Sequence, residues 1–504
     1  MNDGSLGPGA GAPEAAVLSP AAGPRLPTPA VAERVPLCVD LDGTLLRSDS
    51  LVESLLALFK QGLRFLWLAP LWLLRGRALF KAEIGRRVHL DAASLPYHAG
   101  LLAWLREQRA AGRRLALCTA ADQTVAATVA EHLQLFERVL ASDGRVNLKG
   151  RHKRDRLSAE FGEGGYDYAG NAGSDLAVWA RARRAIVVNA RTGLVEQARG
   201  VTEVERVFER EGSSVARAWW RALRPHQWLK NILVFAPLLA AHAWRDTAAL
   251  GAAALAFAAF CLCASGTYLL NDLLDLEADR AHPRKRLRPF ASGALHPGAG
   301  LVASALLVLG AFALAFAISP LFGGALLLYA ALSLSYSLRI KKIEMLDVIA
   351  LAGLYTLRIL AGGAAVRIFP SFWLLAFSMF LFLSLAMVKR CAELLRMIEA
   401  NKVKTKGRGY HVGDLQVLQQ LGGASGYLSV LVLALYMNSS NSQQLYRHPE
   451  ALWLLCPLLL YWISRVWIVC HRGAMHDDPV VFALRDRVSR WLALLAALIV
   501  WLAI

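Results

Sequence analysis

Four oxygen-bearing side chains with regular spacing follow a long apolar segment near the middle of the chain. Asn271, Asp275 and Asp279 are spaced four residues apart, and Asp272 lies next to the first of them. On a helix, this spacing places side chains on one face. Clustered carboxylates repel one another unless they share a cation, and Mg²⁺ prefers oxygen ligands, including those of a substrate diphosphate. The pattern predicts a metal site at a helix mouth, with a solvated acidic helix end as the alternative.

A second pair of carboxylates lies near the N-terminus. Asp40 and Asp42 belong to the string DLDGT, which ends the β-rich run 35–42. Carboxylates at i and i+2 allow one to attack a phosphorus atom while the other handles the leaving-group proton. At the carboxyl end of a strand, such a pair predicts phosphate chemistry.

The elements that must position this pair are short β-rich runs alternating with polar helical stretches. The runs are 35–42, 114–120, 166–170 and 185–190. Their alternation predicts a parallel sheet with crossover helices, and Thr119 falls at the end of the second strand. We place this α/β domain at 34–208. Residues 1–33, rich in Gly, Pro and Ala, are expected to form a disordered leader.

The DLDGT string resembles the first motif of the haloacid dehalogenase (HAD) phosphatases. The resemblance implies a Rossmannoid sheet with a helical cap. It makes Asp40 the nucleophile and a metal ligand, Asp42 the acid/base, Thr119 a phosphate ligand and Lys153 the conserved lysine, with Lys149 as a substitute for it.

The fourth motif of that family departs from its usual pattern in this chain. Asn171 stands where the first carboxylate of GDxxxD is expected, whereas Asp175 remains as an Mg²⁺ ligand. The loss of one carboxylate leaves two interpretations open: a working phosphatase, or a degenerate domain kept for folding or docking.

The stretch between the first two motifs is long enough for a helical cap. It contains the apolar string GLRFLWLAPLWLLRG at 62–76, which is too short to span ~30 Å of hydrocarbon. With Trp67, Trp72 and flanking arginines, it is expected either to lie in the lipid headgroup region or to form a buried cap helix.

Composition changes abruptly after the α/β domain. The whole chain is 56% hydrophobic and 19% charged, which excludes both an ordinary soluble enzyme and a simple membrane bundle. Residues 209–504 are predicted to form an all-α integral membrane bundle of nine transmembrane helices. The nine apolar segments are 231–244, 248–270, 301–318, 321–337, 345–365, 372–388, 425–438, 452–470 and 491–504.

Basic residues are distributed unevenly among the loops of this bundle. The loops after the even-numbered segments are rich in Lys and Arg, whereas the others carry only Arg245, Arg367 and Arg447. The positive-inside rule therefore puts the basic loops in the cytoplasm, on the same side as the α/β domain. This topology accounts for part of the net charge of +18, so a nucleic-acid partner is excluded. We expect a bacterial-type inner (cytoplasmic) membrane protein.

The string NDxxDxxxD at 271–279 resembles the hallmark of the UbiA superfamily of intramembrane prenyltransferases, and the resemblance covers residues 218–504. Three further strings, at 224–231, 282–289 and 472–479, are similar to the branch containing decaprenyl-phosphate phosphoribosyltransferase. That branch transfers 5-phosphoribose from PRPP to a polyprenyl phosphate. The resemblance implies Mg²⁺ bound by Asp272, Asp275 and Asp279, which would be the catalytic residues.

Aromatic prenyltransferases carry a second acidic motif after the sixth helix, where this chain has Lys389 and Arg390 instead. Cations in place of acids suit substrates with several phosphates, because ammonium and guanidinium groups form charge-assisted hydrogen bonds with them. Asn271 and Tyr336 are expected to orient the donor. The other candidate ligands of substrate are Lys230, Asn231, Arg280, Lys285, Arg286, Lys341, Lys342, Lys389 and Arg390.

These observations predict an Mg²⁺-dependent membrane transferase. Its expected partners are PRPP, a polyprenyl phosphate and membrane lipid, and its fused HAD domain removes the 5-phosphate of the product. The alternatives are prenyl transfer from a prenyl diphosphate to an aromatic or quinone acceptor, and a non-catalytic transporter. The sequence leaves open the lipid chain length, the pathway and the oligomeric state, including a homo-oligomer.

Overall fold

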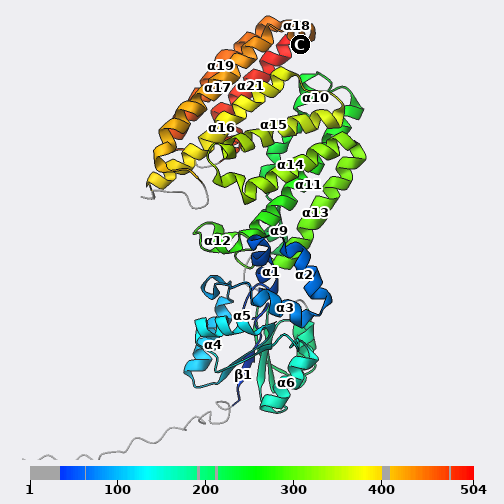
Figure 1. The fold of residues 1–504 in the computed structure, drawn as a ribbon, viewed down its shortest axis with the longest axis vertical. Helices are drawn as coiled ribbons and strands as arrows, with labels where there is room; N and C mark the ends of the chain where they lie inside the picture. The colour runs from blue at the N-terminus through cyan, green and yellow to red at the C-terminus, as the bar shows by residue number, and fades with distance from the viewer. Residues whose placement is uncertain (1–34, 63, 190–192, 210–213, 400–408, 476–477) are drawn as a thin grey trace, which may run out of the picture.

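The computed structural model describes residues 35–504 except 63, 190–192, 210–213, 400–408 and 476–477. The predicted leader at 1–33 lies outside the described residues. Figure 1 shows an α/β domain at one end of the molecule and a long bundle of helices at the other, joined near α9. The predicted α/β domain and helical bundle are therefore both present, at opposite ends of the molecule.

Six parallel strands form the sheet of the α/β domain, in the order β3-β2-β1-β4-β5-β6. The strands are β1 Leu37–Val39, β2 Leu115–Asp122, β3 Arg138–Ser142, β4 Asp167–Gly170, β5 Arg184–Val188 and β6 Glu203–Phe208. The four predicted strands are confirmed, and the parallel arrangement with them. β3 and β6 are additional. β6 is a mostly exposed edge strand, so it lacks the apolar run that marks the central strands.

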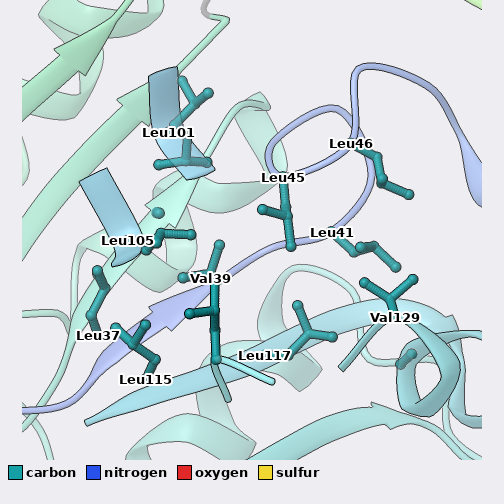
Figure 2. Close-up of a cluster of buried hydrophobic side chains, with 14 of the residues drawn as sticks. Leu37, Val39, Leu41, Leu45, Leu46, Leu101, Leu105, Leu115, Leu117 and Val129 are labelled. Carbon is teal, nitrogen blue, oxygen red and sulfur yellow. The ribbon is translucent and has the colours of Figure 1, made fainter. Parts of the chain in front are cut away.

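Buried leucines and valines fill the space between the sheet and the helices on one of its faces. Figure 2 shows Leu37 and Val39 of β1 packing against Leu115 and Leu117 of β2. The central strand β1 is completely buried, as expected where helices cover both faces of a parallel sheet. This core fixes the direction in which the chain leaves β1, and hence the position of Asp40.

Helices connect the strands and cover both faces of the sheet. They are α1 Ser50–Gln61, α2 Phe65–Leu74, α3 Arg77–Gly85, η2 Ala92–Ser94, α4 Ala99–Ala110, α5 Gln123–Leu133, α6 Arg151–Phe161, η3 Gly173–Asp175, α7 Leu176–Trp179 and α8 Leu194–Arg199. The first three form the predicted cap. Asp49 caps α1 by accepting a hydrogen bond from the backbone N–H of Val52 (3.1 Å), so the cap begins close to the carboxylate loop.

The apolar cap string forms α2, which has two different faces. Phe65 and Ala69 are buried against the rest of the cap, whereas Trp67 and Leu74 are 80% and 84% exposed. Figure 1 places α2 beside the end of the bundle that faces the sheet. A large exposed apolar face next to a membrane domain favours the headgroup interpretation over a fully buried cap helix.

The second half of the chain is entirely helical in its described residues. Its elements are α9 Val215–Leu223, η4 Pro225–Phe235, α10 Ala236–Ala240, α11 Thr247–Leu274, α12 Leu276–Arg280, η5 Lys285–Leu287, α13 Pro297–Ile318, α14 Pro320–Leu338, η6 Ile340–Lys342, α15 Leu346–Val366, α16 Phe372–Glu399, η7 Val412–Asp414, α17 Leu415–Met437, α18 Ser440–Leu445, η8 Pro449–Leu454, α19 Leu455–His471, α20 Pro479–Arg485 and α21 Arg487–Ala503.

Seven helical stretches in the described part of the chain are long and apolar enough to cross a membrane. Seven of the nine predicted membrane segments are therefore confirmed, and the first and last segments are not. The first segment forms η4 and the short α10, and a 3₁₀-helix rises about 2.0 Å per residue, so it covers distance with few residues. The last segment forms α21, which has only 17 residues.

The 3₁₀-helix η4 lies directly against α15, the most buried of the seven membrane helices. Gly362 makes this close approach feasible, because a Cβ there would lie 2.1 Å from the carbonyl oxygen of Val234. The contact fixes η4 deep in the bundle. Its polar residues Lys230 and Asn231 are consequently buried.

The two halves of the molecule touch through a buried ion pair. The two terminal nitrogens of Arg280, Nη1 and Nη2, donate to the carboxylate of Glu53 on α1, at 2.8 and 2.7 Å. Arg280 lies at the end of α12, and both side chains are buried. Leu56 of α1 packs in one apolar cluster with Leu273 and Phe290 of the bundle. The last strand, β6, ends at Phe208 and the first helix of the bundle, α9, begins at Val215.

Removal of one partner of this pair is expected to destabilise the junction strongly. Arg280→Gln leaves the carboxylate of Glu53 buried without its cation, which costs about 3–5 kcal/mol in buried pairs. We expect a lower melting temperature in detergent. The double variant Glu53→Gln/Arg280→Gln should recover most of the loss, because no charge is then left unpaired.

A matched control is Arg199→Gln, which breaks the exposed pair between Arg199 and Glu196. An exposed pair contributes little, so the melting temperature should stay close to that of the wild type. A melting temperature of the Arg280→Gln variant equal to that of this control would contradict a stabilising junction.

Candidate functional site

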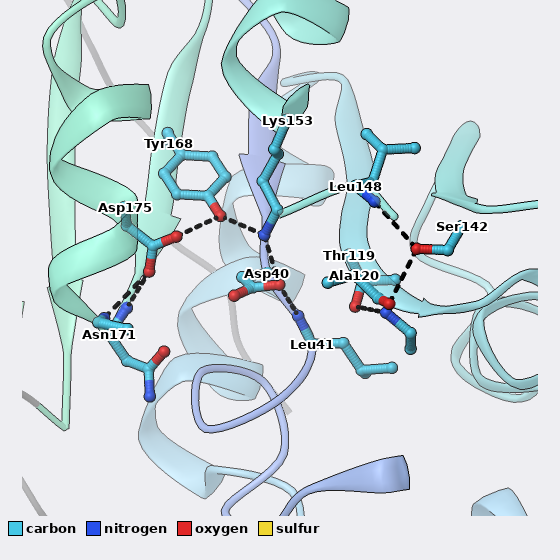
Figure 3. A network of polar contacts seen from close by, with 12 residues as sticks. Asp40, Leu41, Thr119, Ala120, Ser142, Leu148, Lys153, Tyr168, Asn171 and Asp175 are labelled. Atoms are coloured by element: carbon cyan, nitrogen blue, oxygen red, sulfur yellow. Dashed lines mark hydrogen bonds and ion pairs between the residues drawn. The ribbon is translucent and has the colours of Figure 1, made fainter. Parts of the chain in front are cut away.

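The carboxylate loop of the α/β domain sits directly beyond β1. Figure 3 shows the ammonium group of Lys153, on α6, between Asp40 and Tyr168. Its Nζ atom lies 2.8 Å from Oδ1 of Asp40 and 2.7 Å from the hydroxyl of Tyr168. The same hydroxyl donates to Asp175 at 3.2 Å. Three of the predicted residues, Asp40, Lys153 and Asp175, thus belong to one buried network.

Burial alters the proton affinities of these groups. Burial and the nearby carboxylate of Asp175 raise the pKa of Asp40, although Lys153 opposes the shift. Burial and the carboxylate of Asp49 raise the pKa of Asp42 to about 7. Burial disfavours the charge on Lys153, but Asp40 and Asp175 outweigh it and raise the pKa of its ammonium group. The loop therefore combines a charge-paired carboxylate with one that holds a proton near neutral pH.

These groups open into a cavity of about 430 Å³. Its walls come from the carboxylate loop, the cap, the strand ends and the start of α13. They comprise Asp40, Asp42, Gly43, Asp49, Leu51, Leu73, Arg77, Phe80, Lys81, Ala120, Asn147, Lys149, Gly150, Lys153, Asn171, Ala172, Ser174, Asp175 and His296. Lys149 thus lines the cavity together with Lys153. Thr119 is fully buried behind the wall, and its hydroxyl accepts a hydrogen bond from the N–H of Ala121 at 3.0 Å.

Asn171 occupies a lining position next to the carboxylate loop. A Cβ added at Gly43 would lie 2.1 Å from its side-chain amide nitrogen, so the two segments are in close contact. Asp175 accepts hydrogen bonds from the backbone N–H groups of Asn171 and Ala172, each at 3.0 Å. The donor set left for a metal is the carboxylates of Asp40 and Asp175, which are oxygen ligands suited to Mg²⁺.

A second cavity, of about 240 Å³, lies inside the helical bundle. Four of the predicted residues line it: Lys230, Asn271, Tyr336 and Lys389. They come from η4, α11, α14 and α16, so segments distant in sequence converge at one place. Tyr268, Tyr329, Tyr355 and Arg358 supply much of the remaining wall.

A carboxylate is bound between the two lysines of this cavity. Oδ2 of Asp478 lies 2.9 Å from Nζ of Lys230 and 2.9 Å from Nζ of Lys389. Burial disfavours its charge, but the two ammonium groups hold the pKa of Asp478 below its ordinary value. The lysine pair is therefore an anion site that a carboxylate of the chain itself fills.

The acidic cluster lies at the C-terminal end of α11, where the helix ends at Leu274 and α12 begins at Leu276. Asp272 accepts hydrogen bonds from Arg224 at 2.7 and 3.0 Å and from Arg288 at 3.2 Å. Asp279 accepts from the same Arg288 at 2.5 Å. Burial raises the pKa of Asp279, although Arg288 opposes the shift. The cation that these two carboxylates share is thus a guanidinium.

The expected stacking of all four side chains on one face is not seen. Asn271 lines the bundle cavity, whereas Asp272 and Asp279 turn to Arg288. Asp275, at the junction of α11 and α12, forms no ion pair with Lys or Arg among the residues described. Among all the residues that the structure describes, no three His, Cys, Asp or Glu side chains are grouped closely enough to hold a metal ion. The oxygen donors are of the type that Mg²⁺ binds, and Asp275 is the carboxylate available to it.

Arg390 does not face the bundle cavity. Its buried guanidinium lies 2.5 Å from Asp347, 2.5 Å from Glu393 and 2.8 Å from the hydroxyl of Tyr336. Asp347 also accepts a hydrogen bond from Tyr410 at 2.6 Å. This network positions Tyr336, so Arg390 acts on the cavity through that tyrosine.

The remaining predicted ligands of substrate lie elsewhere. Asn231 is fully buried, where its Oδ1 accepts from Arg358 at 3.0 Å. Arg280 binds Glu53 of the other half. Lys285, Arg286 and Lys342 are exposed on short 3₁₀-helices, and Lys341 is partly exposed. Two of these positions thus serve the interior or the junction, and the others face solvent.

Sequence reasoning missed three residues that organise these sites. Arg224 and Arg288 hold the acidic cluster, and Asp478 bridges the lysines. Each falls in a string already compared with the UbiA branch, at 224–231, 282–289 and 472–479. The sequence did not show which residues they pair with, because a pairing between residues distant in sequence depends on the fold.

Comparisons with known proteins identify a family, related sequences and related structures. The profile of the UbiA prenyltransferase family matches residues 232–406. Decaprenyl-phosphate phosphoribosyltransferase of Mycolicibacterium smegmatis is 31% identical over 54% of this chain and 88% of its own length. A solved UbiA homolog from Archaeoglobus fulgidus, bound to GPP and Mg²⁺, has a TM-score of 0.44 and 18% identity, and covers 56% of this chain and 96% of its own.

One relative spans both halves of the molecule. The protein named "Uncharacterized protein y4nM" of Sinorhizobium fredii is 36% identical over 92% of this chain and 90% of its own length. The fusion of the α/β domain to the bundle is therefore shared with that protein. The parallel sheet and the DLDGT loop beyond β1 agree with the HAD resemblance of the first half. With its membrane bundle, its acidic cluster and these relatives, the chain belongs to the UbiA prenyltransferase family.

Proposed function

We propose that the bundle transfers 5-phosphoribose from PRPP to a polyprenyl phosphate, with diphosphate as the leaving group. The observation that carries this proposal is the pair Lys230 and Lys389, which holds the carboxylate of Asp478 in the cavity. A site that binds a carboxylate between two ammonium groups suits a phosphate. The relatives named decaprenyl-phosphate phosphoribosyltransferase support the same donor and acceptor.

Asp275 is the carboxylate proposed to hold Mg²⁺ near the cavity. Asp272 and Asp279 would join it as ligands when the metal displaces the guanidinium of Arg288 that they share. When bound, Mg²⁺ neutralises the charge that develops on the leaving diphosphate. Asn271 and Tyr336 line the cavity and orient the donor. The acceptor is already an anion, so the transfer needs no strong general base. The lysine pair places the acceptor phosphate for attack at the anomeric carbon.

We further propose that the α/β domain removes the 5-phosphate from the lipid-linked product. Asp40 attacks the phosphorus, the bond between phosphorus and the ribose oxygen breaks, and Asp42 gives its proton to the departing oxygen. Water then hydrolyses the aspartyl phosphate and inorganic phosphate leaves, while Asp42 takes up a proton. The raised pKa of Asp42, about 7, supports its role as the acid in the first step.

The experiment that tests the transfer uses purified full-length protein with labelled PRPP or labelled prenyl diphosphate. Each donor is offered with a polyprenyl phosphate and with an aromatic acceptor. We expect label in the lipid fraction only from PRPP with the polyprenyl phosphate. Transfer of label from the prenyl diphosphate to the aromatic acceptor would overturn the proposal in favour of ordinary prenyl transfer.

The variant Lys389→Met tests the lysine pair. It keeps the length of the side chain and removes its charge, and a hydrogen bond to a charged group contributes enough to change binding about tenfold to a hundredfold. We expect KM for PRPP or for the lipid phosphate to rise by that factor. Arg390 is unsuitable for this test, because its removal leaves Asp347 and Glu393 without their buried cation.

Arg472→Gln serves as the control for this variant, since Arg472 is an exposed cation at the end of α19 that does not line the cavity. Its KM values should equal those of the wild type. Unchanged KM values for both substrates in Lys389→Met would remove the lysine pair from the binding site.

A further inference from the structure

The wall of the α/β cavity includes one residue that belongs to the membrane half. His296 immediately precedes α13, a helix able to cross the membrane, and yet it lines the same cavity as Asp40, Asp42 and Lys153. Its Nε2 atom lies 3.8 Å from the carboxylate of Asp49, which caps α1. The phosphatase-like pocket is therefore built from both halves of the chain.

The position of His296 within the pocket is set by the buried junction. Arg280 binds Glu53, and Gly293 packs so closely on Arg47 that an added Cβ would lie 2.6 Å from the Cβ of that arginine. Both contacts precede the histidine in sequence, and Gly298 follows it, where an added Cβ would lie 3.6 Å from Cγ2 of Val52. These contacts hold the start of α13 against the loop that carries the carboxylates.

Asp40 lies deep in this pocket, whereas His296 lies near its opening. Asp40 is 8% exposed and pairs with buried Lys153, whereas the side chain of His296 is 51% exposed. The phosphoryl group that reacts must reach Asp40 at the bottom. His296 lies at the mouth, where the remainder of the substrate emerges toward the membrane.

The hydrogen bonds of His296 define what it can donate. Its Nδ1 accepts the backbone N–H of Gly298 at 3.1 Å and so caps α13. A neutral imidazole that accepts at Nδ1 carries its proton on Nε2, a tautomer assigned here from the hydrogen-bond partner. The ring therefore presents an N–H donor at the mouth of the pocket.

The mouth is also close to apolar surface. Leu73 of α2 lines the pocket, and its neighbour Leu74 is strongly exposed. A pocket that begins where a membrane helix begins, with a leucine in its wall, suits a substrate attached to lipid better than a small soluble one.

We infer that His296 is a positioning residue of the phosphatase pocket, whose Nε2–H binds the anionic phosphodiester that links ribose to its lipid while the 5-phosphate lies against Asp40. The inference rests on the proposed dephosphorylation of the lipid-linked product. It makes the membrane half a determinant of substrate choice: the pocket selects a phosphomonoester carried on a lipid phosphodiester over a free sugar phosphate.

Two substitutions of His296 test its two ring nitrogens separately. His296→Asn keeps an acceptor at the position of Nδ1, which preserves the helix cap, and removes the outer donor. His296→Gln keeps an N–H donor near the position of Nε2 and gives up the better cap. The substrates are lipid-linked 5-phosphoribose, collected from full-length Asp40→Asn protein, and free ribose 5-phosphate, which lacks the phosphodiester.

With full-length protein, we expect His296→Asn to raise KM for the lipid-linked substrate about tenfold, as for a hydrogen bond to a charged group. Its kcat and its kcat/KM on free ribose 5-phosphate should stay within twofold of the wild type. His296→Gln should restore the KM. His471→Asn, at an exposed histidine that ends α19 and lines neither cavity, should match the wild type throughout.

Several results would overturn the inference. They are wild-type kinetics of His296→Asn on the lipid-linked substrate, an equal loss on both substrates, or a loss in both variants that follows their melting temperatures. If Asp40→Asn protein makes the same products as the wild type, the proposed dephosphorylation itself fails. If Asp40→Asn changes the products while His296→Asn keeps the wild-type KM for the lipid-linked substrate, only the role of His296 is lost.

Discussion

Replacement of Asp275 by Asn is expected to abolish phosphoribose transfer while leaving the protein folded in the membrane. Asp275 is the member of the acidic cluster that forms no ion pair with Lys or Arg among the described residues, so its charge is available to a divalent cation. The substitution removes one negative charge and almost no volume. Because metal stabilisation of a leaving diphosphate contributes several kcal/mol, we expect the transfer rate to fall by at least about a thousandfold.

The measurement is the incorporation of label from PRPP into lipid, with the melting temperature recorded beside it. Glu277→Gln is the matched control, since Glu277 is exposed on α12 and carries the same charge in the same turn region. It should retain transfer. Asp272→Asn would be a poorer test, because it also deprives Arg224 and Arg288 of a partner. Mg²⁺-dependent turnover of Asp275→Asn near the wild-type rate would remove this carboxylate from the mechanism.

The second large effect concerns the mass of the product. Wild-type protein given PRPP should release polyprenylphosphoryl ribose, whereas Asp40→Asn should accumulate the form that keeps the 5-phosphate. The substitution removes the nucleophile, and its amide stays close in size to the carboxylate that Lys153 holds at 2.8 Å. Loss of a covalent nucleophile should stop the step within the time of the assay.

Mass spectrometry of the lipid extract distinguishes the two products by one phosphate. Asp155→Asn is a suitable control, because Asp155 is an exposed residue of α6 outside the cavity. It should give the wild-type product. Identical masses from wild-type and Asp40→Asn protein would show that the α/β domain does not act on this lipid, and would favour a degenerate domain, as the replacement at Asn171 allows.

The sequence was informative where chemistry and local structure coincide. The DLDGT string predicted both the end of β1 and the carboxylate of Asp40 that contacts Lys153, because parallel strands bring their carboxyl ends to one edge. It was less informative for β6, whose exposed edge position gives it an ordinary polar composition. The sequence also did not predict that the first membrane segment forms a 3₁₀-helix, because a 3₁₀-helix has no sequence period that separates it from a short α-helix.

Cationic residues were the hardest to assign. Lys230 and Lys389 reach the cavity, whereas Arg280 and Arg390 neutralise buried carboxylates. All four looked alike in sequence, because a basic residue near the cytoplasmic end of a membrane helix satisfies the positive-inside rule whatever it contacts. What separates them is the location of an acidic partner on another helix, which no local pattern contains.

The carboxylate of Asp478 between two lysines has a consequence for the membrane around the enzyme. A headgroup with one negative charge would gain little by replacing a carboxylate of the same charge, whereas a phosphate monoester or diphosphate brings more charge to the same two ammonium groups. Under the proposed function, the carboxylate of Asp478 would exclude singly charged lipid headgroups from the cavity and give way to a more highly charged substrate.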